Sequence, residues 1–284
     1  MAETPMDRME AELWAGPMGE RWLAYRDQFE SMIAQPGEAL IAAAGFKPGE
    51  RVLDVGCGGG ANSLQIARHV APSGSVTGLD ISAALVGACQ TRARDAGIGN
   101  ARFIVGDAGA AAVDGAPFDR LFSRFGIMFF ADPYAAFAHL HGLLKPGGRL
   151  DFACWGPPDR NPWMLEMAGL MRRYADGPPP TPRAPGPFAF AEPDYVREIL
   201  ERGGFKDVRL DPWQGEQFIG GQGADAKTAT RFVLEGLSFA DSLKELPEDT
   251  RHQAEAELAA LMARHEGPKG VSMGSMVWLV SASA

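Results

Sequence analysis

The fold of this chain is decided by residues 52–61, which have the sequence VLDVGCGGGA. An apolar run predicts a strand at 51–55, and the run after the glycines predicts a helix at 61–70. Glycines at such a junction let the backbone turn tightly and approach a ligand without a clash at Cβ. Gly56, Gly58 and Ala61 fit the GxGxxG/A pattern of a dinucleotide site, although glycine turns are common between strands and helices.

The acidic residue before this loop changes the predicted ligand. Asp54 lies two residues before Gly56, where its carboxylate would repel a pyrophosphate and attract an ammonium group. S-adenosylmethionine has no phosphate and carries an amine at its methionine end. The DxGxGxG pattern therefore favours this cofactor over NAD. The alternative is that Asp54 is a solvated or capping residue beside a tight turn.

Two further acids follow predicted strands. Asp80 comes directly after the strand predicted at 75–79, and Asp107 follows the strand predicted at 101–105. The carboxyl ends of parallel strands share one edge of a sheet, where open α/β sheets bind ligands. A carboxylate at Asp80 can accept both hydroxyls of a ribose, and one at Asp107 can accept from an adenine amine. Each acid alone is also typical of a turn or a helix cap.

The chain alternates between strands and helices up to residue 155. This alternation predicts parallel βαβ units in a doubly wound α/β sheet. Beyond residue 155 the sequence becomes rich in Pro and Gly, and the regular alternation stops. The other predicted elements are helices at 82–97, 132–144, 162–174, 192–203 and, for the most part, 224–265, with strands at 118–123, 149–155, 205–218 and 271–281.

Composition argues against several classes of protein. The chain has 284 residues and a formal charge of −9, with 46% hydrophobic and 22% charged residues, as in globular proteins. The acidic balance argues against a nucleic acid partner, because such proteins carry basic stripes. No apolar run approaches the roughly 20 residues of a membrane span, and the N-terminus lacks a signal-peptide core. Three cysteines without a CxxC pair support neither a metal site nor disulfides and indicate a cytoplasmic protein.

Together the motifs resemble those of class I S-adenosylmethionine-dependent methyltransferases, and the flanks are similar to a bacterial small-molecule branch. The matching segments are LDVGCGGG at 53–60, GLDIS at 78–82, GDA at 106–108, FDRLFSRFGIMFF at 118–130 and LLKPGGRL at 143–150. The resemblance covers roughly residues 40–155 and is looser outside them. It implies a Rossmann-like, doubly wound sheet of seven mostly parallel strands, with the last strand inserted antiparallel.

We predict a single methyltransferase domain over residues 1–284. Aromatic residues recur on one helical stripe near the N-terminus, so this segment must pack on another part of the fold. We expect it to cover the carboxyl edge as a lid, and a helix packed permanently on the back of the fold is the alternative. The predicted parts are a helical lid at 1–45, a cofactor-binding core at 46–155, insertions on the substrate side at 156–203 and 222–268, and final strands at about 205–218 and 271–281.

The resemblance implies a role for each matching position. It gives the glycine loop to the methionine end of the cofactor, Asp80 to the ribose and Ile81 to one face of the adenine. Asp107 and Ala108 would hold the adenine edge, and Ser123 would face the methyl group. The predicted cofactor-binding residues are Asp54, Gly56, Cys57, Gly58, Asp80, Ile81, Asp107, Ala108 and Ser123.

The substrate side is predicted mainly from aromatic and apolar side chains. The predicted substrate residues are Trp14, Tyr25, Arg124, Phe125, Met128, Phe129 and Trp155. As a group at one edge they favour a pocket for an apolar or aromatic small molecule, with core packing as the alternative for each. Arg124 would either recognise an anion or pair with a structural acid.

Methyl transfer from a sulfonium is an in-line displacement that depends largely on alignment. His139 and His141 lie near the end of a predicted helix, away from the carboxyl edge, so no catalytic residue is assigned. We therefore predict an S-adenosylmethionine-dependent methyltransferase whose partner is a small-molecule acceptor. The alternatives are a non-catalytic S-adenosylmethionine-binding or scaffold protein and an NAD-dependent oxidoreductase.

Overall fold

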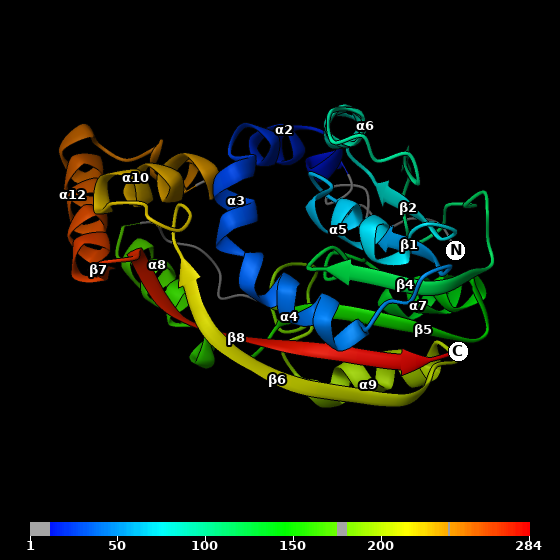
Figure 1. The fold of residues 1–284 in the computed structure, drawn as a ribbon. Coiled ribbons are helices and arrows are strands. Elements are labelled where there is room, and N and C mark those ends of the chain that lie inside the picture. Colours follow the sequence, from blue (N-terminus) through cyan, green and yellow to red (C-terminus); the bar gives the residue numbers. More distant parts are fainter. Residues whose placement is uncertain (1–11, 175–180, 238) are drawn as a thin grey trace.

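The computed structural model describes residues 12–174, 181–237 and 239–284, which form a central sheet with helices on both faces (Figure 1). The sheet has the strand order β3-β2-β1-β4-β5-β8-β6, and β7 pairs with β8 beside this path. The strands are β1 (Arg51–Val55), β2 (Ser75–Asp80), β3 (Ala101–Val105), β4 (Phe118–Arg124), β5 (Leu144–Trp155), β6 (Lys206–Phe218), β7 (Glu266–Gly267) and β8 (Gly270–Ser283). The predicted α/β class with a mostly parallel sheet is confirmed, and the two-residue β7 adds to the seven predicted strands.

The direction of pairing changes across the sheet. Strands β1 to β5 pair in parallel. Strand β1 lies between β2 and β4, and β3 and β5 flank these two. Strand β8 is antiparallel to both β5 and β6, as predicted for the last strand. The strand order reverses between β1 and β4. Such a switch point leaves a crevice at the carboxyl ends of the strands, where doubly wound folds bind ligands.

Helices on the two sides of the switch point cover opposite faces of the sheet, since the crossovers between parallel strands are right-handed. One face is covered by α4 (Ala34–Ala44), α5 (Ala61–Val70) and α6 (Ala83–Asp95), and the other by α7 (Pro133–Gly142) and α9 (Pro193–Arg202) (Figure 1). Side chains that are fully buried between these layers include Leu53, Phe122, Ile127, Phe137 and Phe152.

The remaining helices gather beyond the carboxyl ends of the first strands. Helices α2 (Pro17–Ala24) and α3 (Arg26–Met32) precede α4, and α2 contacts α6. Helix α12 packs on α10 and α8 at the far end of the β6–β8 pair (Figure 1). The later elements are η1 (Pro158–Arg160), α8 (Pro162–Met171), α10 (Ala226–Arg231), the π-helix η2 (Phe232–Gly236), α11 (Phe239–Leu243) and α12 (Glu248–Arg264).

Two elements differ from the sequence prediction by more than a few residues. Strand β5 begins at Leu144 instead of residue 149, because Leu144 pairs with Phe118 across a shift in the β4–β5 register. The helical stretch predicted at 224–265 is divided into several helices, one of which is a π-helix. Such π-turns are often found at functional sites.

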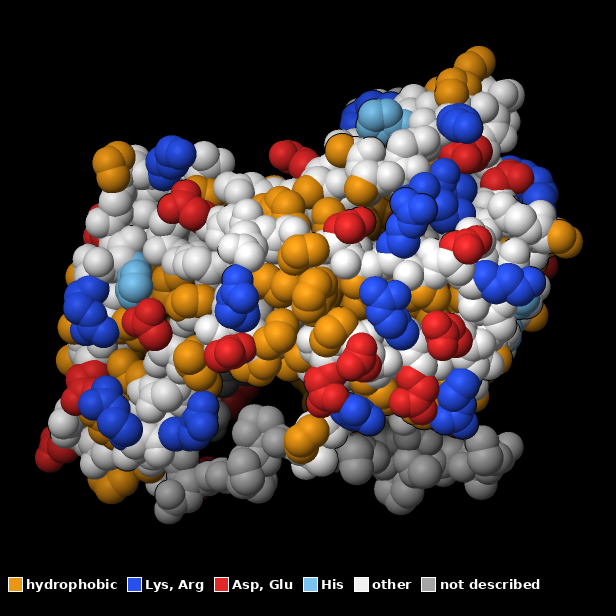
Figure 2. Space-filling model, turned by 90° about the horizontal axis from the view of Figure 1, so that it is seen from below, with side chains coloured by type: hydrophobic (Ala, Val, Ile, Leu, Met, Phe, Trp, Pro, Cys, Tyr) orange, Lys and Arg blue, Asp and Glu red, His pale blue; other side chains and the backbone are white. Residues whose placement is uncertain are grey.

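The surface mixes charges of both signs. Figure 2 shows apolar side chains gathered across the middle of one face, with acidic and basic side chains around them. None of the helices in the described residues combines the length and the apolar character that a membrane crossing requires.

Candidate functional site

The glycine loop follows β1 and is held against the ends of two other strands. The backbone N–H groups of Gly56 and Cys57 donate to the Leu79 carbonyl at 2.8 and 3.1 Å, which fixes the loop to β2. Gly56 has a φ of +66°, and a Cβ added to it would lie 2.7 Å from the Cα of Gly126, after β4. Only glycine fits this position without a shift of the backbone. At Gly56 the loop therefore packs directly against the backbone of the segment that follows β4.

Asp80 organises the loop from the end of β2. Its Oδ2 accepts from the Gly58 N–H at 2.8 Å, and its Oδ1 accepts from the Ser82 N–H at 2.9 Å. Burial raises the pKa of this carboxyl, and the backbone hydrogen bonds partly oppose the shift. Each carboxylate oxygen has a second lone pair. Asp80 can thus support the loop and still accept hydroxyls of a ligand.

Asp54 lies beneath the loop and is only 2% exposed. Its carboxylate accepts a hydrogen bond from the Ser63 hydroxyl on α5. Burial raises the pKa of Asp54 from 3.8 to about 7, against the opposing effects of the Ser63 hydrogen bond and the positive charge of Arg124. A cationic partner would stabilise the charged form of this buried carboxylate.

The other predicted cofactor residues line the same edge in different ways. Asp107 is exposed and its Oδ1 accepts from the Gly109 N–H at 2.8 Å, while Ile81 and Ala108 are half-buried. The side chain of Cys57 is buried in a small cluster beneath the loop, so the loop presents its backbone. Ser123 is fully buried and donates to the Val55 carbonyl at 2.7 Å, which ties β4 to β1.

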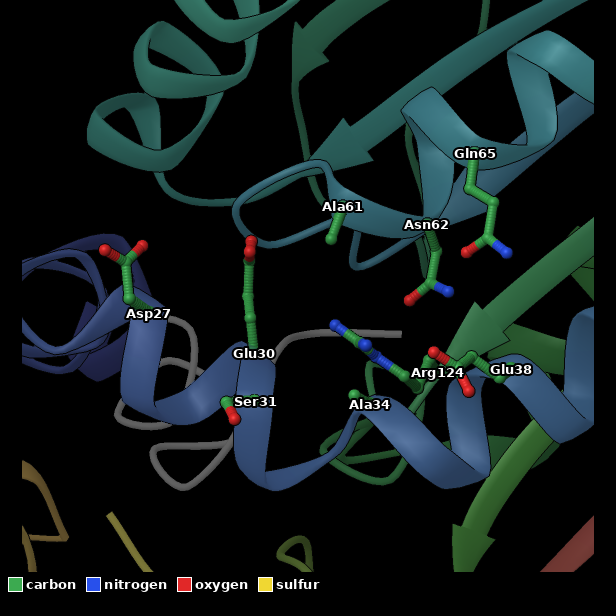
Figure 3. A pocket seen from close by; sticks show the side chains of 9 residues that line it. All are labelled: Asp27, Glu30, Ser31, Ala34, Glu38, Ala61, Asn62, Gln65 and Arg124. Carbon is green, nitrogen blue, oxygen red and sulfur yellow. The ribbon is translucent and has the colours of Figure 1, made fainter. Parts of the chain in front are cut away.

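A polar cavity of about 350 Å³ opens beside the switch point (Figure 3). It lies between the N-terminal helices α3 and α4, the first turns of α5 and the end of β4. Its lining residues are Asp27, Glu30, Ser31, Ala34, Glu38, Ala61, Asn62, Gln65 and Arg124. Of the residues predicted from sequence, Arg124 lines this cavity.

Two side chains in the cavity have groups without a hydrogen bond in the described residues. Asn62 is 6% exposed, and its Oδ1 is buried without a hydrogen bond. Arg124 forms no hydrogen bond or ion pair within the described segments, and burial lowers the pKa of its guanidinium to about 10, against the attraction of the Glu30 and Asp54 carboxylates. Unsatisfied buried polar groups are costly, and ligands are one way to satisfy them. Sequence reasoning missed Asn62, although its place in the first turn after the glycine loop was a usable signal.

The N-terminal helices lie directly on the glycine loop. The Trp22 ring lies 3.5 Å from the position of a Cβ added to Gly58. Glu30 on α3 accepts from Arg92 on α6 at 2.7 Å, and the same Arg92 nitrogen donates to the Gly59 carbonyl at 3.1 Å. This ion pair fastens α3 across the loop to α6.

The predicted substrate residues fall into separate groups. Phe125 and Trp155 stack with ring centroids 4.3 Å apart and are buried, as is Met128. Trp14 packs edge-to-face on Phe129 at 5.0 Å.

The remaining aromatic residue of the substrate prediction joins a different element. Tyr25 packs on Phe232 of the π-helix, and its hydroxyl donates to Glu235, which raises the pKa of the phenol. None of the six predicted aromatic and apolar residues lines the cavity beside Arg124.

Comparisons with known proteins identify a family that this chain resembles. The profile of a family described as "Methyltransferase domain" matches residues 52–148. Nocamycin O-methyltransferase of Saccharothrix syringae is 31% identical over 57% of this chain and 61% of its own length. Aklanonic acid methyltransferase DauC of Streptomyces sp. (strain C5) is 32% identical over 41% of this chain and 53% of its own length. The chain thus spans less than two thirds of either relative.

Solved structures show the same fold. The YcgJ protein of Bacillus subtilis superimposes with a TM-score of 0.56 at 17% identity, covering 87% of this chain and 97% of that one. The BH2331 protein of Bacillus halodurans gives a TM-score of 0.54 at 18% identity and the same two coverages. The profile therefore supports a methyltransferase domain over residues 52–148, and the strand order agrees with the fold that the resemblance to class I S-adenosylmethionine-dependent methyltransferases implied. The matched family supports S-adenosylmethionine as the cofactor, as predicted.

Proposed function

We propose that this protein transfers a methyl group from S-adenosylmethionine to a small, apolar or aromatic molecule by in-line displacement. The observation that carries the proposal is the polar cavity at the switch point, where within the described residues the buried Asn62 Oδ1 has no donor and Arg124 forms no hydrogen bond. Its unmet needs are a hydrogen-bond donor for the Asn62 Oδ1 and an anion for the Arg124 guanidinium. The ammonium and carboxylate of the cofactor's methionine end supply both.

Residues in the cavity and along the neighbouring strand ends support binding of the cofactor here. Arg124 would bind the methionine carboxylate, while Asn62 and the buried Asp54 would face the ammonium group. Asp80 has free lone pairs for the ribose hydroxyls. Ile81, Asp107 and Ala108 extend along the same edge from the ends of β2 and β3, where the adenine would lie. When bound, the cofactor supplies an activated methyl group, and the chain's part is to orient it and exclude water.

The acceptor would bind beside the N-terminal helices. A continuous aromatic cluster supports this, since Trp22 stacks on Phe29 at 5.6 Å and Phe29 packs on Phe232 at 4.9 Å. Tyr25, Trp14 and Phe129 border these helices, and the stacked Phe125 and Trp155 lie deeper. The two relatives above are named for nocamycin and aklanonic acid, which supports a small-molecule acceptor here.

The lid is part of the same proposal. Helices α2 and α3 rest on the glycine loop through Trp22 and the Glu30–Arg92 ion pair. Movement of this segment would admit the acceptor, and its return would cover the reacting atoms. Residues 1–11 of the predicted lid lie outside the described residues. The proposed single domain over 1–284 includes this segment and the later helical insertions.

The function is tested in two steps on the full chain. Calorimetry with S-adenosylmethionine and S-adenosylhomocysteine measures cofactor binding, and an acceptor screen with methyl-labelled cofactor, read by mass spectrometry, measures transfer. We expect binding of both cofactor forms and label transfer to an aromatic acceptor. A folded chain that binds neither form would contradict the proposal. Binding without transfer across the screen would favour the non-catalytic alternative.

A further inference from the structure

Gln217, near the end of β6, is a buried side chain whose hydrogen-bonding groups are both unsatisfied. It has no exposed surface, and neither its Oε1 nor its Nε2 has a partner in the described residues. Buried polar groups without partners destabilise a fold, so their presence calls for a reason such as a ligand. Gln217 does not line the polar cavity at the switch point, so the cofactor placed there does not satisfy it.

Strand pairing places Gln217 on the face of the sheet that carries Trp155. Gln217 is paired with Met273 on β8. Trp155 on β5 is paired with Val277, four residues further along β8. Paired residues share a face of a sheet, as do residues an even number of positions apart on one strand. Trp155 also stacks on Phe125, the residue after β4, so the amide shares its face with the aromatic pair beside the switch point.

The strand positions around the amide carry no charged side chain on this face of the described β6–β8 pair. They are Trp213, Gly215 and Gln217 on β6 and Met273, Ser275 and Val277 on β8. The Trp213 ring lies over Gly215, and Met273 is buried. A charged ligand edge would lose its hydration here without an ionic partner. The surroundings therefore favour a ligand whose polar edge is uncharged.

Helix α3 closes over this end of the sheet. The end of β6 and the start of β8 extend beyond the carboxyl ends of β4 and β5 towards α10 (Figure 1). Helix α3 contacts β6, and the Ser31 hydroxyl accepts from the Gln222 N–H, just after β6, at 2.9 Å. Movement of the proposed lid would thus uncover the end of β6 together with the cofactor cavity.

We propose that Gln217 binds the methyl acceptor and selects molecules whose far edge carries an uncharged N–H or O–H beside a carbonyl. The inference rests on the proposed function, because it concerns the substrate of the same reaction. The Gln217 Nε2 donates to the carbonyl oxygen and its Oε1 accepts from the neighbouring N–H or O–H, which fits a lactam, a carboxamide or a hydroxyl next to a carbonyl. The strand from Val277 to Met273 spans roughly 13 Å, so a planar molecule of two or three fused rings reaches from the Trp155 position towards the amide.

Three probes of similar shape separate the polar edge from the rings. The first is 2-quinolone, a two-ring aromatic lactam whose N–H and C=O lie side by side. In N-methyl-2-quinolone the N–H is blocked, and 2-naphthoate carries a charged carboxylate instead. Each probe is titrated into the full chain saturated with S-adenosylhomocysteine, and its dissociation constant is measured by ligand-observed NMR.

Gln217→Met removes both amide groups and keeps an unbranched side chain of similar length. The matched control is Gln214→Met, on the same strand but exposed and on the opposite face. We expect the wild type to bind 2-quinolone roughly 10-fold more tightly than either other probe, through hydrogen bonds that only the lactam forms. Gln217→Met should lose this preference and Gln214→Met should keep it, while all three chains bind S-adenosylhomocysteine equally. Gln217→Leu, a second apolar variant, should behave as Gln217→Met does.

The outcomes distinguish this inference from the proposed function. A wild type that binds S-adenosylhomocysteine without preferring 2-quinolone contradicts the role of Gln217, while the cofactor site stands. A preference that survives in both apolar variants also contradicts it and makes the amide a purely structural feature. A folded wild-type chain that does not bind S-adenosylhomocysteine overturns the proposed function, and the inference falls with it.

Discussion

Replacing Asp54 by Asn should stabilise the protein without ligand and weaken its hold on cofactor. The native carboxylate is 2% exposed, and burial raises its pKa from 3.8 to about 7. Asparagine has nearly the same shape, and its side-chain oxygen can still accept from the Ser63 hydroxyl. The substitution therefore removes a buried charge while keeping the local hydrogen bond.

The sign of the pH dependence follows from this raised pKa. The folded state favours protonated Asp54, so between pH 3.8 and about 7 the folded chain binds more protons than the unfolded chain. The stabilisation is fully present below pH 3.8 and is lost as the pH rises through the folded-state pKa. A shift of about three units corresponds to roughly 4 kcal/mol of stability lost above pH 7. Asparagine at position 54 does not titrate.

Urea denaturation of the wild type and Asp54→Asn, at about pH 5 and about pH 8, measures the effect. The variant's gain in unfolding free energy should be larger at pH 8 than at pH 5 by roughly 3 kcal/mol. This value corresponds to about two pH units, from pH 5 to the folded-state pKa of Asp54 at about 7. Calorimetry with S-adenosylhomocysteine should show affinity roughly 10-fold lower or worse, because a charged hydrogen bond is removed. Equal gains at both pH values would refute the buried-charge argument, and unchanged affinity would refute the ammonium contact.

Three substitutions and one ion-pair variant test other parts of the structure. Asp80→Ala should weaken S-adenosylhomocysteine binding roughly 10- to 150-fold, through loss of hydrogen bonds to a charged group. Gly56→Val should abolish cofactor binding, because its Cβ would lie 2.7 Å from the backbone after β4 and would displace the loop. The far-UV circular dichroism should stay near native. Gln217→Leu should raise the unfolding free energy by roughly 1–3 kcal/mol, since both amide atoms of this fully buried side chain lack hydrogen bonds in the described residues. Arg92→Ala should free Glu30 and increase hydrogen exchange of residues 14–29 without ligand, by loss of the ion pair to α6.

Matched controls accompany these variants. Asp211→Ala removes an exposed carboxylate from the sheet edge at β6 and should leave cofactor affinity unchanged. Gly142→Val adds a side chain where nothing lies within 4 Å of a new Cβ. Arg94→Ala removes an exposed cation from α6 without touching the pair to α3. Normal binding by Gly56→Val, lower stability of Gln217→Leu, or equal exchange in the two arginine variants would contradict the respective arguments.

Local patterns in the sequence were enough to predict the strands of the parallel sheet. Alternation of apolar runs with amphipathic helices depends only on neighbouring residues, and the observed β1 to β4 agree with it within one residue. Asp54, Asp80 and Asp107 follow from the same logic, because a residue at the carboxyl end of a parallel strand lies at the ligand edge whatever packs around it.

The cavity itself was decided by tertiary structure alone. Glu30 and Glu38 precede the first strand, Asn62 begins α5 and Arg124 ends β4, so no local pattern links them. They meet because α3 and α4 pack across the switch point, which depends on side-chain contacts between distant segments. The same packing buried Phe125 and Trp155 against each other, although their sequence positions only indicated the correct edge. The spacing of apolar residues and the succession of strands and helices depend on neighbouring residues. The walls of a cavity depend on which distant surfaces pack together.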